Sequence, residues 1–294
     1  MKKIILILIL IGAFGFGHAQ NSKVVSAYNY AKPNYKQYDK AKTAIDEAVE
    51  HEKTSQDPKA WFYRGRIYQQ IYQDSTFHHL CENPLKVVVE SFEKSLEYDA
   101  KNKFKKEVVN LYNIALQQIR NEAINALKAK EYQKSYEMFD LLIKGTANEN
   151  TMALNEVYDG AAFYAGYTAE ETGNIEKAHA FYDQSIAEGK EMSRAHIRKG
   201  LLYLNANDSA AYLAIMQKGI ETVEDNKDIL LLLIDYYNKA KKMDEALTYI
   251  NKAIEKDPQN VKLYQAQGDI LSAMDKPEEA LKSYNKAMEI APDD

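Results

Sequence analysis

One phrase of this sequence returns after 34 residues: residues 251–260 read NKAIEKDPQN and residues 285–294 read NKAMEIAPDD. Windows of 34 residues that begin at Asp159, Ser193, Lys227 and Val261 align without a gap. Small residues dominate three places of these windows, the eighth (Gly166, Gly200, Ile234, Gly268), the twentieth (Ala178, Tyr212, Ala246, Ala280) and the twenty-seventh (Ser185, Gly219, Ala253, Ala287). A fixed period of this length indicates a repeat architecture.

The pattern favours pairs of antiparallel helices. Small side chains at a helix contact let the two axes approach closely, and larger ones beside them fill the remaining volume. Pro258 and Pro292, both at the thirty-second place, end the second helix because proline lacks an N–H and clashes with the preceding turn. The chain has only 12 Gly and 6 Pro, and no stretch alternates apolar and polar residues long enough for a sheet.

These places resemble those of the tetratricopeptide repeat family. The stretch LYQAQGDILSAMDKPEEALKSYNKAMEIAP has Tyr264, Gly268, Leu271, Ala280, Tyr284, Ala287 and Pro292 where the family motif has them. The resemblance implies an all-α fold, a right-handed α-solenoid of about seven helix-turn-helix hairpins. The window from Ser193 departs from the motif at Tyr212 and lacks a terminal proline, so we expect its second helix to be looser or shifted.

The regular array covers residues 150–294, in which residues 150–158 lengthen the first helix of the first window. Residues 20–149 predict irregular hairpins of the same kind, beginning near Ser22, with an insertion at 74–84. All six prolines, Pro33, Pro58, Pro84, Pro258, Pro277 and Pro292, fall at predicted helix boundaries.

Residues 1–19 have the pattern of a secretory signal peptide. Lys2 and Lys3 precede an apolar run from Ile4 to Gly17, and Gly17-His18-Ala19 offers a small-residue cleavage site, which we place after Ala19. The run is shorter than the roughly 18 residues of a spanning helix, which disfavours an uncleaved anchor. The residue directly after the site is Gln20 and not the cysteine that a lipid anchor requires. We therefore expect a periplasmic or secreted protein with no membrane span after cleavage.

Charge and motifs exclude several functions. The formal charge of −5 becomes −7 without Lys2 and Lys3, and no basic block remains that could hold a phosphate backbone, so we expect no nucleic-acid partner. Phosphate-loop, zinc-helix, C-x-x-C and G-x-S-x-G motifs are absent, which predicts no enzymatic activity and no cofactor. His78, His79 and Cys81 are weak metal-ligand candidates, because their spacing leaves a closed site unsatisfied. As the only cysteine, Cys81 cannot form an intramolecular disulfide.

The family resemblance implies that ligands contact the concave side of the first helices. The corresponding residues are Phe62, Arg66, Arg120, Ile124, Phe163, Tyr167, Ile197, Leu201, Leu204, Leu231, Asp235, Asn238, Gln265 and Asp269. Their apolar middle and acidic far end predict a protein or peptide partner. In the alternative interpretation the groove is filled by neighbouring parts of the same chain. The family's carboxylate-gripping pattern is missing, so recognition of a free peptide C-terminus is not expected.

The last window raises a second possibility. Leu281, Met288 and Ile290 have no following hairpin to pack against, which predicts an exposed edge that docks on a partner or on a second copy of the chain. The sequence therefore leaves three hypotheses open: a protein-binding scaffold, a homodimer assembled through this edge, and, least supported, a metal-dependent protein that uses residues 74–84.

Overall fold

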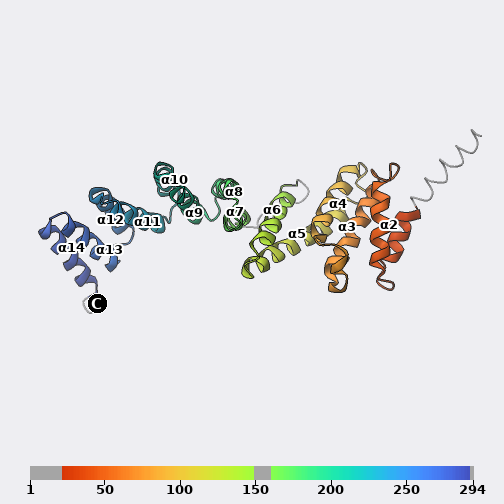
Figure 1. Ribbon diagram of the computed structural model, residues 1–294, viewed down its shortest axis with the longest axis horizontal. Coiled ribbons are helices and arrows are strands. Elements are labelled where there is room, and N and C mark those ends of the chain that lie inside the picture. Colours follow the sequence, from red (N-terminus) through yellow and green to blue (C-terminus); the bar gives the residue numbers. More distant parts are fainter. Residues whose placement is uncertain (1–21, 149–159, 292–294) are drawn as a thin grey trace, which may run out of the picture. The chain divides into compact units, whose positions relative to one another are not determined.

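The computed structural model describes residues 22–148 and 160–291, and within those ranges the regular structure is helical, without a strand. The chain divides into two compact units, Met1–Ala161 and Ala162–Asp294. Figure 1 shows the helices of each unit as successive hairpins. The expectation of an all-α repeat fold is confirmed. The predicted signal peptide and the extra residues 150–158 lie outside the described ranges.

The first unit contains three hairpins in its described part. Residues 22–30 are helical and precede the second helix of the first hairpin. The other elements are α2 (Tyr38–Glu50), α3 (Pro58–Gln73), the 3-10 helix η1 (Ser75–Leu80), α4 (Pro84–Tyr98), α5 (Lys105–Lys128) and α6 (Tyr132–Thr146). The pairs α3–α4 and α5–α6 pack along their lengths. The predicted insertion at 74–84 contains η1 and ends at Pro84, the first residue of α4.

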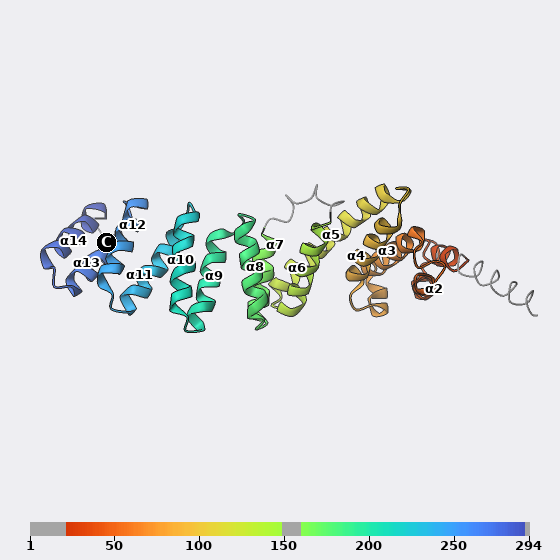
Figure 2. The same ribbon diagram turned by 90° about the horizontal axis from the view of Figure 1, so that it is seen from above.

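The second unit reproduces the 34-residue period in its helix boundaries. Its elements are α7 (Ala161–Glu171), α8 (Ile175–Ala187), α9 (Met192–Asn205), α10 (Ser209–Thr222), α11 (Lys227–Lys239), α12 (Met243–Lys256), α13 (Val261–Ala273) and α14 (Pro277–Ile290). The four second helices begin at Ile175, Ser209, Met243 and Pro277, each 34 residues after the one before. Each hairpin contacts the next through α8–α9, α10–α11 and α12–α13, and Figure 2 shows α9 to α14 following one another in chain order.

The small and large places of the repeat form one packing unit. A Cβ added to Gly166, at the eighth place, would lie 2.7 Å from Cε1 of Tyr182, at the twenty-fourth. Because that distance is far shorter than a normal carbon contact, the tyrosine ring can lie on α7 only where no side chain is present. In the window from Lys227 the eighth place holds the larger Ile234 instead of glycine, and the twenty-fourth place holds Ile250, which is smaller than tyrosine. The two isoleucines belong to one buried cluster.

The turn inside each hairpin also repeats, although its sequence does not. The fifteenth place holds Gly173, Asn207, Lys241 and Asp275, whose φ angles of 78°, 59°, 58° and 59° are all left-handed. The following N–H then donates to a carbonyl five residues earlier, as from Asp208 to Tyr203 at 2.9 Å. This is the helix-ending arrangement usually made with glycine. Packing of the two helices therefore imposes the turn even where lysine or aspartate occupies it.

The expected looseness of the window from Ser193 is wrong. Helix α10 spans 14 residues, as do α12 and α14, and Tyr212 is 1% exposed. Gly200 leaves the room for the larger ring, since an added Cβ there would lie 3.3 Å from Cδ2 of Tyr212. The Tyr212 hydroxyl donates to the carbonyl of Leu232 at 3.4 Å, which ties α10 to the next hairpin.

The proline boundaries hold wherever the structure describes them. Pro58, Pro84 and Pro277 are the first residues of α3, α4 and α14. Pro33 lies between the first two helices and Pro258 follows the end of α12. Pro292 lies outside the described residues. Over residues 22–148 and 160–291, no helix has both the length and the apolar character needed to cross a bilayer.

Candidate functional site

The first unit presents little of the predicted apolar groove. Phe62 is 2% exposed and stacks on Phe104 at 5.3 Å between ring centroids. The Arg66 guanidinium lies 5.5 Å from the Phe62 ring and 3.3 Å from a carboxylate oxygen of Glu107. Arg120 and Ile124 are half-buried on α5. Phe62 is therefore part of the core and offers no contact surface.

At the start of the second unit, arginines of α9 cover aromatic rings of α7. The Arg194 guanidinium lies 4.1 Å from the centroid of Phe163, which is 2% exposed. Arg198 lies 4.9 Å from the Tyr167 ring. Such contacts between guanidinium groups and rings are favourable and remove the ring face from water. Of the two predicted aromatic contacts here, Tyr167 is half-buried and Phe163 is buried.

A partly buried network of Arg198, Glu170 and Tyr182 fixes this arrangement. Arg198 Nη2 lies 2.8 Å from Oε1 of Glu170, and the Tyr182 hydroxyl donates to Oε2 of the same carboxylate at 2.6 Å. Burial, together with the hydrogen bond to Glu170, raises the pKa of Tyr182 well above that of a free tyrosine. The phenol therefore stays protonated and continues to donate at any physiological pH. Helices α7, α8 and α9 are linked through Glu170.

The apolar middle of the predicted groove lies on α9 and α11. Ile197, Leu201 and Leu204 are half-buried and lie on one face of α9, three and four residues apart. Ile197 and Leu204 also pack against the core around Tyr212 and Met216. On α11, Leu231 is 49% exposed. It is the most open apolar side chain among the predicted groove residues of the second unit.

Acidic and polar side chains continue this surface. Asp235, Asn238, Gln265 and Asp269 are exposed on α11 and α13. Asp235 forms an ion pair with Lys239 one turn later at 2.7 Å, and Asp269 accepts a hydrogen bond from the Tyr284 hydroxyl at 2.7 Å. We call the surface made by Tyr167, Ile197, Leu201, Leu204, Leu231, Asp235, Asn238, Gln265 and Asp269 the first-helix face.

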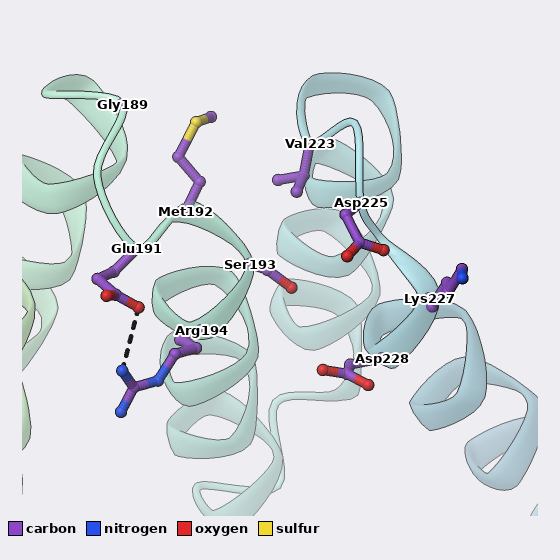
Figure 3. A pocket seen from close by; sticks show the side chains of 9 residues that line it. All are labelled: Gly189, Glu191, Met192, Ser193, Arg194, Val223, Asp225, Lys227 and Asp228. Atoms are coloured by element: carbon purple, nitrogen blue, oxygen red, sulfur yellow. Dashed lines mark hydrogen bonds and ion pairs between the residues drawn. The ribbon is translucent and has the colours of Figure 1, made fainter.

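A pocket that the sequence did not predict adjoins the first-helix face. It has a volume of about 410 Å³ and is lined by Gly189, Glu191, Met192, Ser193, Arg194, Val223, Asp225, Lys227 and Asp228. Figure 3 shows these residues around the start of α9 and the loop between α10 and α11. Asp228 and Leu231 are three residues apart on α11, so the pocket lies one turn from the exposed leucine. The available sequence signal was a pair of aspartates three residues apart, Asp225 in the inter-repeat loop and Asp228 in the first turn of α11.

The weak metal candidates are engaged with the backbone. His78 and His79 are exposed and Cys81 is half-buried. His78 Nε2 lies 2.7 Å from the carbonyl oxygen of Tyr72, and His79 Nδ1 lies 3.0 Å from that of Thr76. In the part of the chain that the structure describes, no group of three or more His, Cys, Asp or Glu residues could hold a metal ion.

His196 is buried in the second unit at 0% exposure. Its Nδ1 lies 2.8 Å from the carbonyl oxygen of Met192, to which it can donate, while Nε2 is buried and has no hydrogen-bond partner among the residues that the structure describes. Burial lowers the pKa of His196; the nearby cations Lys218 and Lys199 act in the same direction, and the Met192 carbonyl and Asp183 oppose them. Protonation would place a second N–H in a site without an acceptor.

Because of the buried His196, we expect the free energy of unfolding to fall in weak acid. The folded-state pKa lies below the unfolded value of about 6.5, so the unfolded chain binds the proton first as the pH falls. The free energy of unfolding therefore does not depend on His196 titration well above pH 6.5. Below that pH it declines, by at most about 1.4 kcal/mol per pH unit, until the folded-state pKa is passed. Urea denaturation of the native chain and His196→Asn between pH 7.5 and 5 measures this, with exposed His79→Asn as control. A stability difference between native chain and His196→Asn that does not change with pH would contradict the assignment.

Comparison with known proteins supports the repeat pattern. Family models described as tetratricopeptide repeats match residues 198–261 and 249–282. No curated protein matches the chain in sequence.

Solved structures with similarity to the chain include a MamA protein, at 16% identity and a TM-score of 0.45, covering 60% of this chain and 92% of that one. MamA from Desulfovibrio magneticus RS-1 has 17% identity and a TM-score of 0.42, covering 60% and 95%. YrrB, described as a TPR protein with an unusual peptide-binding site, has 18% identity and a TM-score of 0.40, covering 70% and 94%. Since these scores are below 0.5, the fold assignment rests on the helices and the family matches.

Proposed function

Because the chain carries tetratricopeptide repeats across residues 198–282, we propose that it is a non-enzymatic scaffold that binds a protein or peptide on the first-helix face of its second unit. The observation that carries the proposal is the exposure of Leu231, 49% on a first helix, beside the half-buried leucines of α9. Full burial of a leucine is worth about 1.5–3 kcal/mol, and because Leu231 is already about half covered, a partner that covered the rest would gain roughly half of that, ~0.7–1.5 kcal/mol.

The polar part of the face supports specific rather than indiscriminate contact. Asp235 and Asp269 are exposed on α11 and α13, and both follow the apolar residues of the face in the sequence. Exposed charged groups at the border of an interface favour partners of complementary charge and repel partners of like charge. An apolar centre with a charged border is the usual composition of a protein interface.

The proposal places the scaffold outside the cytoplasm, in the periplasm of a Gram-negative cell or beyond it. Its support is the pattern of residues 1–19, with two lysines, an apolar run and a small-residue cleavage site. The partner is then another exported or envelope protein. Detection of mature chain that begins at residue 20 tests this part of the proposal.

Site-specific photo-crosslinking in the producing cells tests the binding face. A benzoylphenylalanine at position 231 of α11 is expected to crosslink a partner protein, because the side chain projects from the first-helix face. The same group at position 255, an exposed place on α12, is the matched control and is expected to give no such product. Equal crosslinking from both positions, or crosslinking from 255 alone, would contradict the proposed face.

One further observation favours a second candidate function, self-association through α14. Leu281 and Met288 are 59% and 61% exposed and lie seven residues apart on one helical face. Ile290 is half-buried. Exposed apolar side chains grouped in this way can contact a second copy of the chain. Substitution of Leu281, described in the Discussion, separates this candidate from the first.

A further inference from the structure

The pocket beside the first-helix face contains both signs of charge, but its cations are already engaged. Arg194 lies 3.1 Å from a carboxylate oxygen of Glu191 and also covers the Phe163 ring. Lys227 Nζ lies 3.9 Å from Oδ2 of Asp257 and points away from the pocket centre in Figure 3. Each basic group of the pocket therefore has an acidic neighbour of its own.

The aspartates of the pocket have no such neighbour. Asp225 and Asp228 are exposed, and no hydrogen bond or ion pair within the described residues reaches either carboxylate. Figure 3 shows both carboxylates and the Ser193 hydroxyl directed toward the space between α9 and α11. Two uncompensated negative charges at the edge of a pocket attract a cation more strongly than either would alone.

The walls of the pocket suit a side chain with an apolar stem. Met192 and Val223 are half-buried and line the pocket together with the carboxylates. Lysine and arginine place their methylene groups on apolar surface and their charged ends in polar surroundings. The volume of about 410 Å³ falls in the range of small-ligand pockets, ~300–1,000 Å³, so one such side chain fits. A bare metal ion does not suit the site, because the described residues include no cluster of three metal ligands.

We propose that this pocket receives a lysine or arginine side chain of the bound peptide, with an apolar residue of the same peptide on Leu231. The inference rests on the proposed function and specifies its ligand as an apolar segment with an adjacent basic residue. The spacing follows from α11, where Asp228 and Leu231 are one turn apart on the same face. Asp269, further along the face, has only the neutral Tyr284 hydroxyl as its hydrogen-bond donor, so its charge repels acidic peptides and adds to the preference.

Selection from a random dodecapeptide library on the purified full chain tests the inference. Selected peptides are expected to carry lysine or arginine next to a large apolar residue. For one selected peptide, replacing the basic residue by glutamine is expected to weaken binding tenfold or more, because a charge-assisted contact is lost. The Asp225→Asn/Asp228→Asn variant is expected to weaken binding of the unmodified peptide to a similar extent.

The chain offers a matched control for the protein variant. Asp244 and Glu245 are exposed in the first turn of the second helix α12. The Asp244→Asn/Glu245→Gln variant removes the same charge from a helix start away from the pocket, and its affinity is expected to stay within twofold of the native chain. Circular dichroism verifies the fold of both variants, and the glutamine peptide tests the site without altering the protein.

The outcomes separate this inference from the proposed function. Selected peptides without a basic residue, bound equally by the native chain and by Asp225→Asn/Asp228→Asn, overturn the basic-residue pocket and leave the binding scaffold in place. Equal weakening by the α12 control variant also overturns it, since the effect is then one of net charge. If no peptide is selected and position 231 gives no crosslink, the proposed function itself fails.

Discussion

Tyr182→Ala is expected to lower the free energy of unfolding by about 3–5 kcal/mol, the range for removing a large buried aromatic side chain. Tyr182 is 0% exposed and lies on Gly166, where the helix has no side chain to fill the space that would be left. Its loss also removes the hydroxyl that donates to Glu170 at 2.6 Å, while the ion pair of this carboxylate with Arg198 remains. Urea denaturation followed by far-ultraviolet circular dichroism measures the change.

Tyr284→Ala is the matched control, because Tyr284 occupies the same place of the last repeat over Gly268. Tyr284 is only half-buried, and its hydroxyl contacts exposed Asp269. We expect a loss of about 1–2 kcal/mol, in proportion to the smaller area that it buries. Equal effects of the two substitutions would show that burial against the eighth-place glycine does not determine the stability of a repeat.

The periodic part of the fold could be predicted from the sequence because packing repeats with the residues. Small residues at the eighth and twentieth places, together with prolines at helix ends, were sufficient to place the second helix of each hairpin, namely α8, α10, α12 and α14. A large side chain at one place can be accommodated by a small one at a facing place, and this could not be predicted from each place alone. Tyr212 was expected to loosen α10, yet Gly200 on the facing helix accommodates its ring. The pair of places, rather than either one, determines the fit.

The turns and the candidate site were less accessible to sequence reasoning. Lys241 and Asp275 adopt left-handed backbone conformations because the helices on either side require them, although lysine rarely adopts this conformation and aspartate does so only occasionally. Phe163 was assigned to the groove by its place in the repeat, but Arg194 from the next hairpin covers it. The pocket with Asp225 and Asp228 combines two loops and two helices from different repeats, and no single sequence window contains that arrangement.

A matched pair of substitutions tests whether the second unit binds its partner through the first-helix face. Leu231→Glu on α11 and Leu281→Glu on α14 change leucines that are 49% and 59% exposed. Both variants should fold, since neither leucine belongs to the buried core. Leu231→Glu is expected to weaken binding of a selected dodecapeptide tenfold or more. Losing the contact of this half-exposed leucine costs roughly 0.7–1.5 kcal/mol, and desolvating the new carboxylate against an apolar residue of the peptide adds to that cost, while 1.4 kcal/mol corresponds to a factor of ten.

The decisive measurement is the dissociation constant of that peptide for the two variants and the native chain, determined by fluorescence anisotropy with light scattering on the same samples. If the partner binds the first-helix face, this constant rises tenfold or more for Leu231→Glu and stays within twofold of the native chain for Leu281→Glu. Unchanged binding by Leu231→Glu, with loss of binding or of self-association in Leu281→Glu, would contradict binding through this face and assign the interaction to α14.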